Sequence, residues 1–562
     1  MGLNPPQTTR LPWQRFFCCV CLSLRPTAAY VPRQRSSVFR TGIRSSCHTV
    51  GAAPCDDSGK QRQTALVWLR TSLRLEDNKA LREGIEHGPD GLTIVFVWER
   101  GAIPLTPSAA FECAAARQLD QQLRAKGNLL KIIDVNSHNN SLCSISLLRN
   151  VIEQLQVQTV VVDANSSENG KEPSLLQKSL ATNPRTCHIK VVSITEDGSL
   201  LPFALVPKAL GRSRYGGRVL RWPTFLSNMS KHCVETPIAT PDTIPKPVNE
   251  ASDSLPIANL AGAWAASLLE TWGEVSEKEA LRRAQDCQHA QQALMTLGYR
   301  DVVQVDSRLS PYLRWGIISP RQAYHLGVRK RDLLWRDWSH MCYRHVNALR
   351  KGEPALRHLD GCYFARDCRE IDENDLFLAW CRGETGYRMI DAGMRQLWCE
   401  GWMPRHVRLL VANFLVEGLG IDWRKGRDWF RYTLVDHDPA INELMWQNAG
   451  FCGIDLFYRG LNWDVNNDGN DYIQQWASKT LELSPTLSKQ LSLSNEHISE
   501  VVQSHREELK RRNLYGIAAK VANSGVRVLW DGLVDTEESS SSTGPNPGDV
   551  WGIGLDPLGS LR

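Results

Sequence analysis

Several polar side chains lie in a stretch of predicted helices, and they are of types that can hold a ligand. Between Trp380 and Gln447 apolar residues recur at helical spacing, which indicates packed helices. The stretch also contains charged and amide side chains that a plain hydrophobic core would lack: Arg395, Arg408, Asp436, Asp438 and Asn442. Buried charge is costly unless it is paired or holds a ligand. The stretch therefore predicts a helical pocket for a large, planar, polar molecule. The alternative is an amphipathic bundle whose charges face water.

Tryptophan is abundant, with 19 residues in the chain. Six of them cluster in or beside the same helices: Trp380, Trp398, Trp402, Trp423, Trp429 and Trp446. Tryptophan usually fills a core. Its ring is also among the easiest side chains to oxidise by one electron. The cluster is therefore a candidate electron path if a redox cofactor lies nearby.

Composition places the chain among globular proteins of more than one domain. It has 562 residues, of which 42% are hydrophobic and 23% charged, and its formal net charge is +5. This charge alone does not predict nucleic-acid binding. The segment 312–351, however, carries nine Lys and Arg against two Asp, so it could follow a phosphate backbone. A solvated helix face is the alternative. The 16 cysteines are scattered, and their spacing predicts reduced thiols and no metal site.

Residues 1–63 are predicted to be a targeting presequence without a fold. No acidic residue precedes Asp56 and no lysine precedes Lys60, whereas arginines recur, which is typical of transit peptides. A short apolar run, Phe16–Leu24, resembles the signal-peptide part of the bipartite plastid presequences of algae with secondary plastids. We therefore expect delivery to a plastid (chloroplast), with the mitochondrion as the alternative. No other apolar run is long enough to span a membrane.

The remaining chain divides by pattern into an α/β part and a helical part. Residues 64–232 alternate strand patterns (65–69, 92–98, 129–133, 159–162, 188–194) with helical ones, which predicts a doubly wound parallel sheet. Residues 233–271 begin with a Pro-, Thr- and Ser-rich stretch and are predicted to be an interdomain linker. Residues 272–491 are predicted to be nearly all helix. Residues 492–562 are predicted to be a helix followed by a disordered tail.

Five segments together resemble the DNA photolyase/cryptochrome family. The segment VWLRTSLRLEDNKAL, Val67–Leu81, is similar to the family's opening motif. The likeness continues in the family's order and spacing through Ser307–Gln322, Leu333–Trp338, Gly383–Trp402 and Leu434–Gln447. The resemblance implies an α/β domain followed by an all-α domain that binds FAD. It is strongest with an outlying branch similar to the plant photolyase-like proteins.

The resemblance implies contacts to FAD at eight positions: Ser307, Leu309, Ser310, Arg336, Arg408, Asp436, Asp438 and Asn442. The first three precede a helix, where N–H groups and hydroxyls suit a diphosphate. Arg336 would face the flavin or its phosphates. Arg408 would lie against the flavin ring and pair with Asp436, and Asp438 would accept hydrogen bonds from the flavin edge. Asn442 would face flavin N5, where an amide oxygen favours a reduced flavin.

The resemblance also implies electron transfer and DNA contact. Trp446 and Trp423 match the first two members of the family's electron-transfer chain, but the third position is Glu370. Its substitute is left open among four residues: Trp402, Trp398, Tyr363 and Tyr387. Four positions would meet the lesion or the DNA: Asp332, Trp335, Arg405 and His406. These depart from the dimer-photolyase pattern, because Asp332 stands for Glu and Pro404-Arg405-His406 stands for His-Asn-Arg.

The expected function is that of a photolyase, a carbon–carbon lyase that repairs UV-induced pyrimidine dimers in DNA by light-driven electron transfer. The alternative is a cryptochrome-type blue-light photoreceptor without enzymatic activity, which the altered lesion pocket favours. An antenna chromophore of folate or deazaflavin type, if the chain carries one, is expected between the two domains. We expect DNA as the partner and a monomeric protein.

Overall fold

The computed structural model describes residues 62–98, 106–135, 144–164, 172–194, 198–202, 205, 222–248, 263–296, 306–363, 373–454, 463, 471–479, 481, 491 and 493–514. Nearly all of the predicted presequence, the tail beyond residue 514 and Glu370 lie outside these ranges. Within these ranges no helix has the length and apolarity needed to cross a bilayer.

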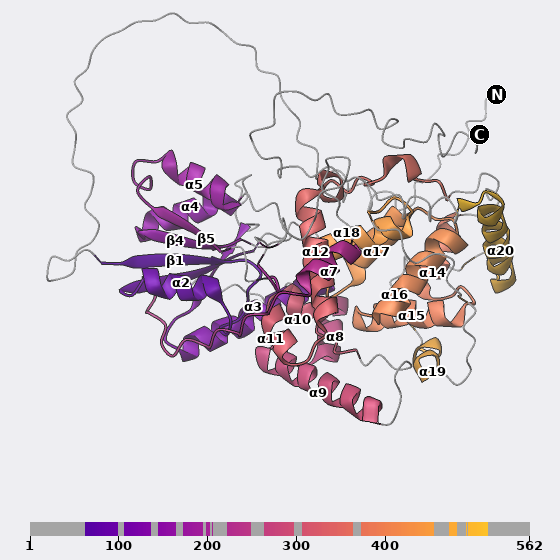
Figure 1. Cartoon of the computed structure of the whole chain (residues 1–562), viewed down its shortest axis with the longest axis horizontal. Helices are drawn as coiled ribbons and strands as arrows, with labels where there is room; N and C mark the ends of the chain where they lie inside the picture. Colours follow the sequence, from indigo (N-terminus) through magenta and orange to yellow (C-terminus); the bar gives the residue numbers. More distant parts are fainter. Residues whose placement is uncertain are drawn as a thin grey trace, which may run out of the picture. The chain divides into compact units, whose positions relative to one another are not determined.

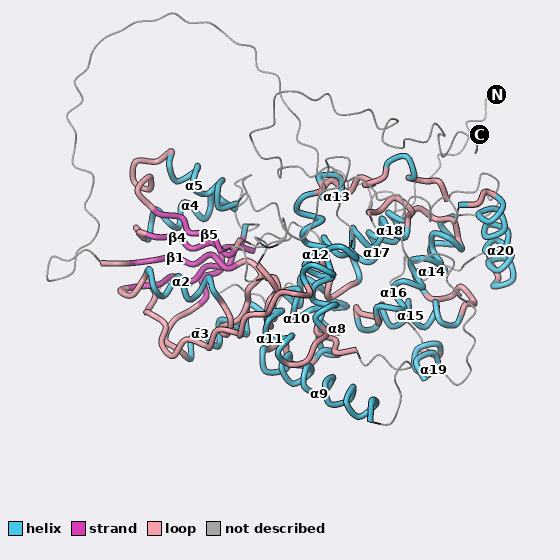
Figure 2. The backbone as a smooth tube through the Cα atoms, viewed as in Figure 1, coloured by secondary structure: helices cyan, strands magenta, loops and turns pink. Residues whose placement is uncertain are grey.

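Five parallel strands form the sheet of the first half: β1 (Thr64–Leu69), β2 (Gly91–Trp98), β3 (Leu130–Asp134), β4 (Thr159–Asp163) and β5 (Lys190–Ile194). Their order is β3-β2-β1-β4-β5, so the chain winds outward in both directions from β1 (Figures 1 and 2). The register of β1 on β2 runs from Thr64 opposite Gly91 to Leu69 opposite Phe96. The predicted doubly wound parallel sheet is confirmed.

Helices cover both faces of this sheet. α2 (Lys79–His87) and α3 (Pro107–Ala125) lie on one face, and α4 (Ser144–Leu155) and α5 (Glu172–Ala181) lie on the other (Figure 1). Alternate residues of each strand therefore enter different cores, for example Val67 with α2 and α3, and Leu66 with α4 and α5. A strand buried on both faces is hydrophobic throughout, which is why the strands were predictable from sequence.

The second half is helical, and its elements follow in chain order: α7 (Trp222–Met229), α8 (Ala263–Trp272), α9 (Glu277–Thr296), α10 (Ser310–Arg314), α11 (Pro320–His325), α12 (Lys330–His345), α13 (Asn347–Arg350), η4 (Arg357–Leu359), α14 (Glu373–Arg382), α15 (Arg388–Glu400), α16 (Arg405–Asn413), η5 (Phe414–Gly418), α17 (Trp423–Thr433), α18 (Pro439–Ala449), α19 (Asp471–Ala477) and α20 (Asn495–Arg511). The predicted linker was wrong at its end, because α8 lies within it. The predicted boundary at residue 232 also cuts off α7, which packs against α12.

The loop after β1 holds the two halves together. The Nη1 of Arg74 donates to the carbonyl of Gly316 at 2.9 Å, and Arg74 is almost completely buried. Asp77 forms a fully buried ion pair with Arg321 of α11 at 2.9 Å. The opening motif VWLRTSLRLEDNKAL thus anchors the α/β half on the helical half, and the core of buried residues continues from one half into the other.

Candidate functional site

A cavity of about 350 Å³ lies among the helices α10, α12, α16, α17 and α18. All eight positions predicted to contact FAD line it, and so do Trp446, Asp332, Trp335 and Arg405. The wall also contains Trp402, a candidate for the third electron-transfer position, together with Arg314 and Asp306, which the sequence did not single out as site residues. The predicted residues come from segments far apart in the chain, and folding has brought them to one place. Trp423 and His406 are not part of the cavity wall.

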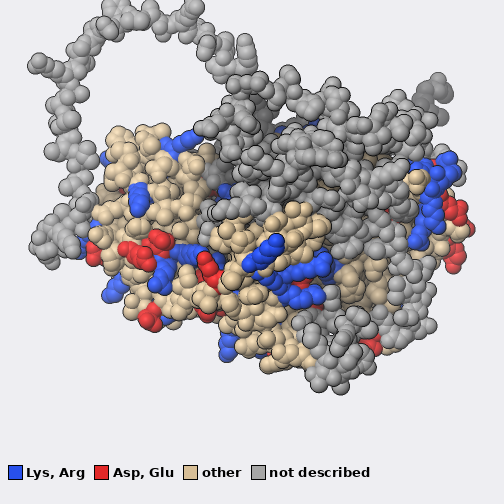
Figure 3. Space-filling model, viewed as in Figure 1, with Lys and Arg blue, Asp and Glu red and all other residues tan. Residues whose placement is uncertain are grey.

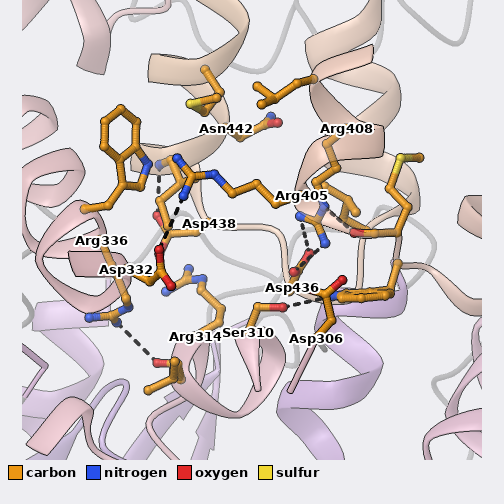
Figure 4. Close-up of a pocket in the computed structure, with 18 of the residues that line it drawn as sticks. Asp306, Ser310, Arg314, Asp332, Arg336, Arg405, Arg408, Asp436, Asp438 and Asn442 are labelled. Atoms are coloured by element: carbon orange, nitrogen blue, oxygen red, sulfur yellow. Dashed lines mark hydrogen bonds and ion pairs between the residues drawn. The ribbon is translucent and has the colours of Figure 1, made fainter. Parts of the chain in front are cut away.

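Arg408 and Asp436 form a two-pronged ion pair on one side of the cavity (Figure 4). The Nη1 of Arg408 donates to Oδ1 of Asp436 at 3.1 Å, and Nη2 donates to Oδ2 at 2.7 Å. The Nε of Arg408 is fixed by the carbonyl of Met403 at 2.9 Å. All three nitrogens of the guanidinium are therefore held by the protein, which leaves the flat face of the group for a ligand.

Asp438 joins α18 to α12. Its Oδ1 caps α18 by accepting from the N–H groups of Ala440 at 3.0 Å and Ile441 at 3.3 Å. Its Oδ2 lies 2.7 Å from Nε2 of His340, and both side chains are buried. Burial acts to raise the pKa of Asp438, but His340 and the guanidiniums of Arg314 and Arg336 outweigh it and hold that pKa well below its usual range.

His340 was missed in the sequence. Burial lowers its pKa, which favours a neutral imidazole that donates Nε2–H to Asp438. The available signal was its spacing, since His340 follows Arg336 by one helical turn on α12. A histidine at that spacing is common in helices that bind nothing, so the signal was weak. Because Asp438 is predicted to meet the flavin edge, His340 sets the orientation of that carboxylate.

Asn442 lies in the first turn of α18 and lines the cavity. Its Nδ2 donates to the carbonyl of Arg427 at 3.1 Å. A carbonyl can only accept, so this bond fixes which end of the amide is the oxygen. Over the described ranges Oδ1 has no hydrogen-bond partner, and it remains an acceptor for a ligand N–H. This is the arrangement that a contact with flavin N5 requires.

The arginines on the α10 and α12 side hold backbone carbonyls. Arg336 donates to the carbonyls of Gly198 and, at 3.2 Å, Leu313, and burial lowers its pKa (Figure 4). Arg314 donates from Nε to the carbonyl of His437 at 2.9 Å. Both therefore bring positive charge to the cavity wall while their position is fixed by the main chain. Whether Arg336 faces the flavin or its phosphates stays a prediction.

The segment before α10 supplies the remaining predicted contacts. Ser310 begins α10, and its hydroxyl accepts a hydrogen bond from Nε1 of Trp402 at 3.0 Å. Leu309 is buried, and Ser307 and Ser310 remain accessible. Between them Arg308 pairs with Glu400 at 2.9 Å. The Nε–H of Arg308 is buried, and among the described residues it has no hydrogen-bond partner.

The residues predicted to meet DNA are partly engaged with one another. Asp332 pairs with Arg329 at 2.8 Å and with Arg405 at 3.6 Å. The guanidinium of Arg405 also lies over the ring of Trp335, 5.3 Å from its centroid. His406 is exposed. The carboxylate and the ring that would meet a lesion are thus covered by Arg405, whose side chain would have to move aside.

The cavity fits FAD in charge and in wall chemistry. Its wall holds six arginines and four aspartates, an excess of two positive charges, which suits a diphosphate. Apolar side chains that could contact a planar ring include Leu409, Ala412, Ile441 and Met445. Arg408, Asp438 and Asn442 offer the polar contacts that a flavin edge needs. The residues present therefore match the group that the family resemblance implies.

The basic segment 312–351 is less exposed than its composition predicted. Arg321 is buried in its ion pair with Asp77, and Arg314 and Arg336 donate to internal carbonyls. Exposed cations remain at Arg329, Arg331 and Lys351. Arg314, Arg321 and Arg336 are therefore engaged inside the protein, and contact of the remaining cations of this segment with phosphates stays a prediction. On the face shown in Figure 3, Lys and Arg side chains gather in separate clusters with Asp and Glu between some of them.

Comparison with known proteins gives two family matches. Residues 65–190 match the family described as DNA photolyase, and residues 329–508 match the family described as FAD binding domain of DNA photolyase. The deoxyribodipyrimidine photo-lyase of Agrobacterium fabrum is 29% identical over 476 residues, which cover 79% of this chain and 91% of that protein. Cryptochrome-1 of Arabidopsis thaliana is 27% identical over 480 residues, covering 75% of this chain and 63% of that protein.

Solved structures show the same fold. A bacterial class III photolyase from Agrobacterium tumefaciens matches with a TM-score of 0.64 and 26% identity, covering 81% of this chain and 99% of that one. An archaeal photolyase from Sulfolobus tokodaii, solved with two FAD molecules, matches with a TM-score of 0.57 and 24% identity, covering 79% of this chain and 100% of that one.

Proposed function

Because this chain belongs to the DNA photolyase/cryptochrome family, we propose that it is a blue-light-driven DNA photolyase that splits UV-induced pyrimidine dimers. FAD is its cofactor, bound in the cavity among α10, α12, α16, α17 and α18. The observation that carries this proposal is the convergence on one cavity of the Arg408–Asp436 pair, the capping carboxylate of Asp438 and the free amide oxygen of Asn442.

The protein's own groups position and tune the cofactor. Bound FAD supplies the light-excited electron donor. Arg408, held in place by Asp436 and Met403, presents a rigid positive face to the ring. The Nδ2 of Asn442 is held by the carbonyl of Arg427, so its Oδ1 would be available to accept a hydrogen bond from a protonated N5 and would favour the reduced flavin.

DNA would approach the side of the cavity where Arg329, Asp332 and Arg405 lie. Arg329 and Arg405 carry the exposed positive charge there, and Asp332 links them. A damaged base entering the cavity needs a polar group for its edge and an aromatic ring for its face. Asp332 and Trp335 are of the right types, provided that Arg405 turns outward to a phosphate.

A cryptochrome-type photoreceptor is the second candidate function. The covering of Trp335 and Asp332 by Arg405 favours it. A repair enzyme would lose affinity for the lesion if its own side chain filled the lesion pocket, whereas a photoreceptor does not bind a lesion and would lose nothing. The likeness to Cryptochrome-1 of Arabidopsis thaliana is compatible with this alternative. The flavin cavity would serve both functions equally.

Three further properties belong to the same proposal. We propose delivery to a plastid, on the arginine-rich and acid-poor composition of residues 1–55, with the mitochondrion as the alternative. We propose that the protein acts as a monomer on damaged DNA. We propose a second, light-harvesting chromophore, for which the folate and deazaflavin types are the candidates.

Two lesion substrates would test the proposed function. The mature protein with reduced FAD would be illuminated with blue light beside an oligonucleotide that carries either a cyclobutane dimer or a (6-4) photoproduct. We expect loss of the cyclobutane dimer in light and none in darkness. Repair of the (6-4) product alone would mean that this lesion, rather than the cyclobutane dimer, is the substrate. Photoreduction of the flavin without repair of either lesion would favour the photoreceptor.

A further inference from the structure

We propose that Trp446, Trp380, Trp429, Trp398 and the neighbouring Trp264 and Tyr432 form an electron relay from the flavin cavity to the protein surface. This relay is distinct from the predicted route through Trp423. It rests on bound flavin, which the proposed function shares, but it does not require DNA repair and would serve a photoreceptor equally well.

The inner part of the relay begins at the cavity wall. Trp446 of α18 lines the cavity and is 2% exposed. Its ring meets that of Trp380 edge to face, with the centroids 6.2 Å apart and the planes at 78°. Trp380 belongs to α14, is completely buried and is held by a hydrogen bond from Nε1 to the carbonyl of Val411 at 3.0 Å. An electron lost by Trp446 can thus be replaced from Trp380.

Two phenylalanines bridge Trp380 to its surroundings. Phe377 stacks on Trp380 with a centroid distance of 5.8 Å and meets Trp429 edge to face at 6.4 Å. Phe430 lies between Trp446 and Trp380, at 5.0 Å and 6.3 Å. A phenyl ring is too hard to oxidise to carry the charge itself. Phe377 therefore acts as a packed bridge between the two oxidisable rings of Trp380 and Trp429.

The outer part of the relay is a stack. Trp429 of α17 stacks on Trp398 of α15, with the centroids 5.9 Å apart and the planes at 11°. Trp398 stacks on Trp264 of α8 at 4.6 Å, and Trp264 stacks on Tyr432 at 5.5 Å. Trp264 and Tyr432 are partly exposed. Five helices, α18, α14, α17, α15 and α8, thus contribute rings to a path of contacting rings from the cavity to solvent.

The predicted route through Trp423 lacks this continuity in the described part of the chain. No aromatic ring there makes a stacked or edge contact with Trp423, whereas the guanidiniums of Arg424 and Arg427 lie 4.5 Å and 5.2 Å from its ring centroid. The hydroxyl of Tyr363 accepts from the backbone N–H of Trp423, but Tyr363 is completely buried and does not reach the surface. The third position of the family chain, Glu370, lies outside the described residues.

The four buried rings also fill the core, and packing alone would explain each of them singly. Their continuity from a cavity to the surface is the feature that packing does not require. Trp402, another candidate from the sequence, lies in the cavity wall with the guanidiniums of Arg308 and Arg408 at 5.0 Å and 5.9 Å. Positive charge at that distance disfavours a positively charged ring. Of the candidates for the missing third position, Trp398 is the one within the stack.

The electron balance of the relay is simple. Trp446 gives one electron to the light-excited oxidised flavin and becomes a cation radical. Each oxidised ring is then reduced by the next ring outward, so that the positive charge moves along the relay to Tyr432. Tyr432 gives up its phenolic proton to water and becomes a neutral radical. A thiol in solution returns one electron and one proton to it and becomes a thiyl radical. Two such radicals, from two photoreduction events, combine into one disulfide.

The test uses the full chain with oxidised FAD, without oxygen, in a thiol buffer under blue light, and it follows flavin photoreduction by absorbance. Trp423→Phe should keep a rate within about threefold of wild type, because the relay remains. Adding Trp429→Phe should lower the rate by about tenfold or more. Adding Trp476→Phe instead is the matched control, because Trp429 and Trp476 are each 5% exposed and Trp476 lies off the path.

Trp398→Phe provides a second break in the relay in case Trp429→Phe fails to fold, and bound flavin absorbance checks each variant. A tyrosyl radical should appear by electron paramagnetic resonance after a flash and should be missing in Tyr432→Phe. Loss of photoreduction in Trp423→Phe alone, or no further loss on adding Trp429→Phe or Trp398→Phe, would overturn the relay. A chain that retains no flavin would instead contradict the cofactor assignment.

Discussion

At the scale of single residues, the cavity is built from side chains that are fixed by the protein on one side and open to a ligand on the other. Arg408 is held by Asp436 and a carbonyl, Asn442 by the carbonyl of Arg427, and Asp438 by His340 and by the N-terminus of α18. Such fixing lowers the entropy cost of binding, because the contacting groups are already ordered.

The Arg408–Asp436 pair should be needed for flavin retention. Asp436→Asn removes the negative charge and one of the two acceptors of Arg408, so the guanidinium is held less firmly against the cofactor. We expect FAD affinity to fall by about tenfold to a hundredfold, which corresponds to about 1.4–3 kcal/mol for charge-assisted bonds. Fluorescence titration of the apoprotein with FAD measures this change.

The Arg405–Asp332 pair offers the matched control. It is longer, at 3.6 Å, and its side chains are 45% and 34% exposed, so Asp332→Asn should leave FAD affinity unchanged. Equal losses in Asp436→Asn and Asp332→Asn would mean that net charge, rather than the bidentate contact, retains the cofactor.

Asn442 should determine how stable the reduced flavin is relative to the oxidised flavin. Asn442→Leu removes the acceptor Oδ1, and it also leaves the carbonyl of Arg427 without its donor. We expect the reduced flavin to lose about 1 kcal/mol of stabilisation relative to the oxidised form and to reoxidise faster in air. Stopped-flow absorbance with oxygen measures the rate. An unchanged rate with FAD still bound would show that N5 lies elsewhere.

At the scale of helices and strands, α18 carries the chemistry because its N-terminal cap and its first turn both lie at the cavity. Pro439 begins the helix, Asp438 caps it, and Asn442 and Trp446 follow at successive turns on the cavity side. A single helix thus fixes the spacing between the flavin-edge contact, the N5 contact and the first ring of the relay.

Two substitutions at Asp438 should separate capping from charge. Asp438→Asn keeps an oxygen that can cap α18 but weakens the bond with His340, whereas Asp438→Ala loses both. We expect Asp438→Ala to lose about 1 kcal/mol more stability than Asp438→Asn and to retain no FAD. Urea unfolding and flavin content after purification measure both. Normal flavin content in Asp438→Ala would contradict the pocket assignment.

The sheet was predictable because each strand is buried on both faces and is therefore hydrophobic along its length. The helix α8 was missed because it follows a Pro- and Thr-rich stretch that hides its start. Its Trp264 and Trp272 nevertheless tie it to α15, since their indole N–H groups donate to the carbonyls of Trp398 and Glu400. The cavity positions were predictable only from the family segments. No sequence pattern pairs His340 with Asp438, or Phe377 with Trp429, because both pairings depend on how distant helices pack.

At the scale of the whole molecule, the α/β and helical halves meet through buried charged groups. Glu277 of α9 accepts a hydrogen bond from Gln322 of α11 and lies near Arg74, Glu76 and Asp77 of the α/β half. Burial raises the pKa of Glu277 from 4.5 to about 7, against the hydrogen bond from Gln322. The folded state therefore binds this proton more tightly than the unfolded state.

The sign of the resulting pH dependence follows from that shift. The contribution of Glu277 to stability is fully present below pH 4.5 and is lost as the pH rises through about 7. Glu277→Gln should therefore be more stable than wild type by about 3 kcal/mol at pH 8 and nearly equal to it at pH 4.5. Urea unfolding at the two pH values measures this. Exposed Glu86→Gln on α2 is the control, and the same result for both variants would refute the assignment.

The most direct single measurement is the number of cyclobutane dimers that the flavin-loaded protein removes from a defined oligonucleotide in blue light and in darkness. We expect many dimers to be removed per protein molecule in light and none in darkness, since the electron returns to the cofactor after each cleavage. If the dimers persist in light although reduced FAD is bound and absorbs the light, the protein is not a photolyase for this lesion, and the photoreceptor function is favoured.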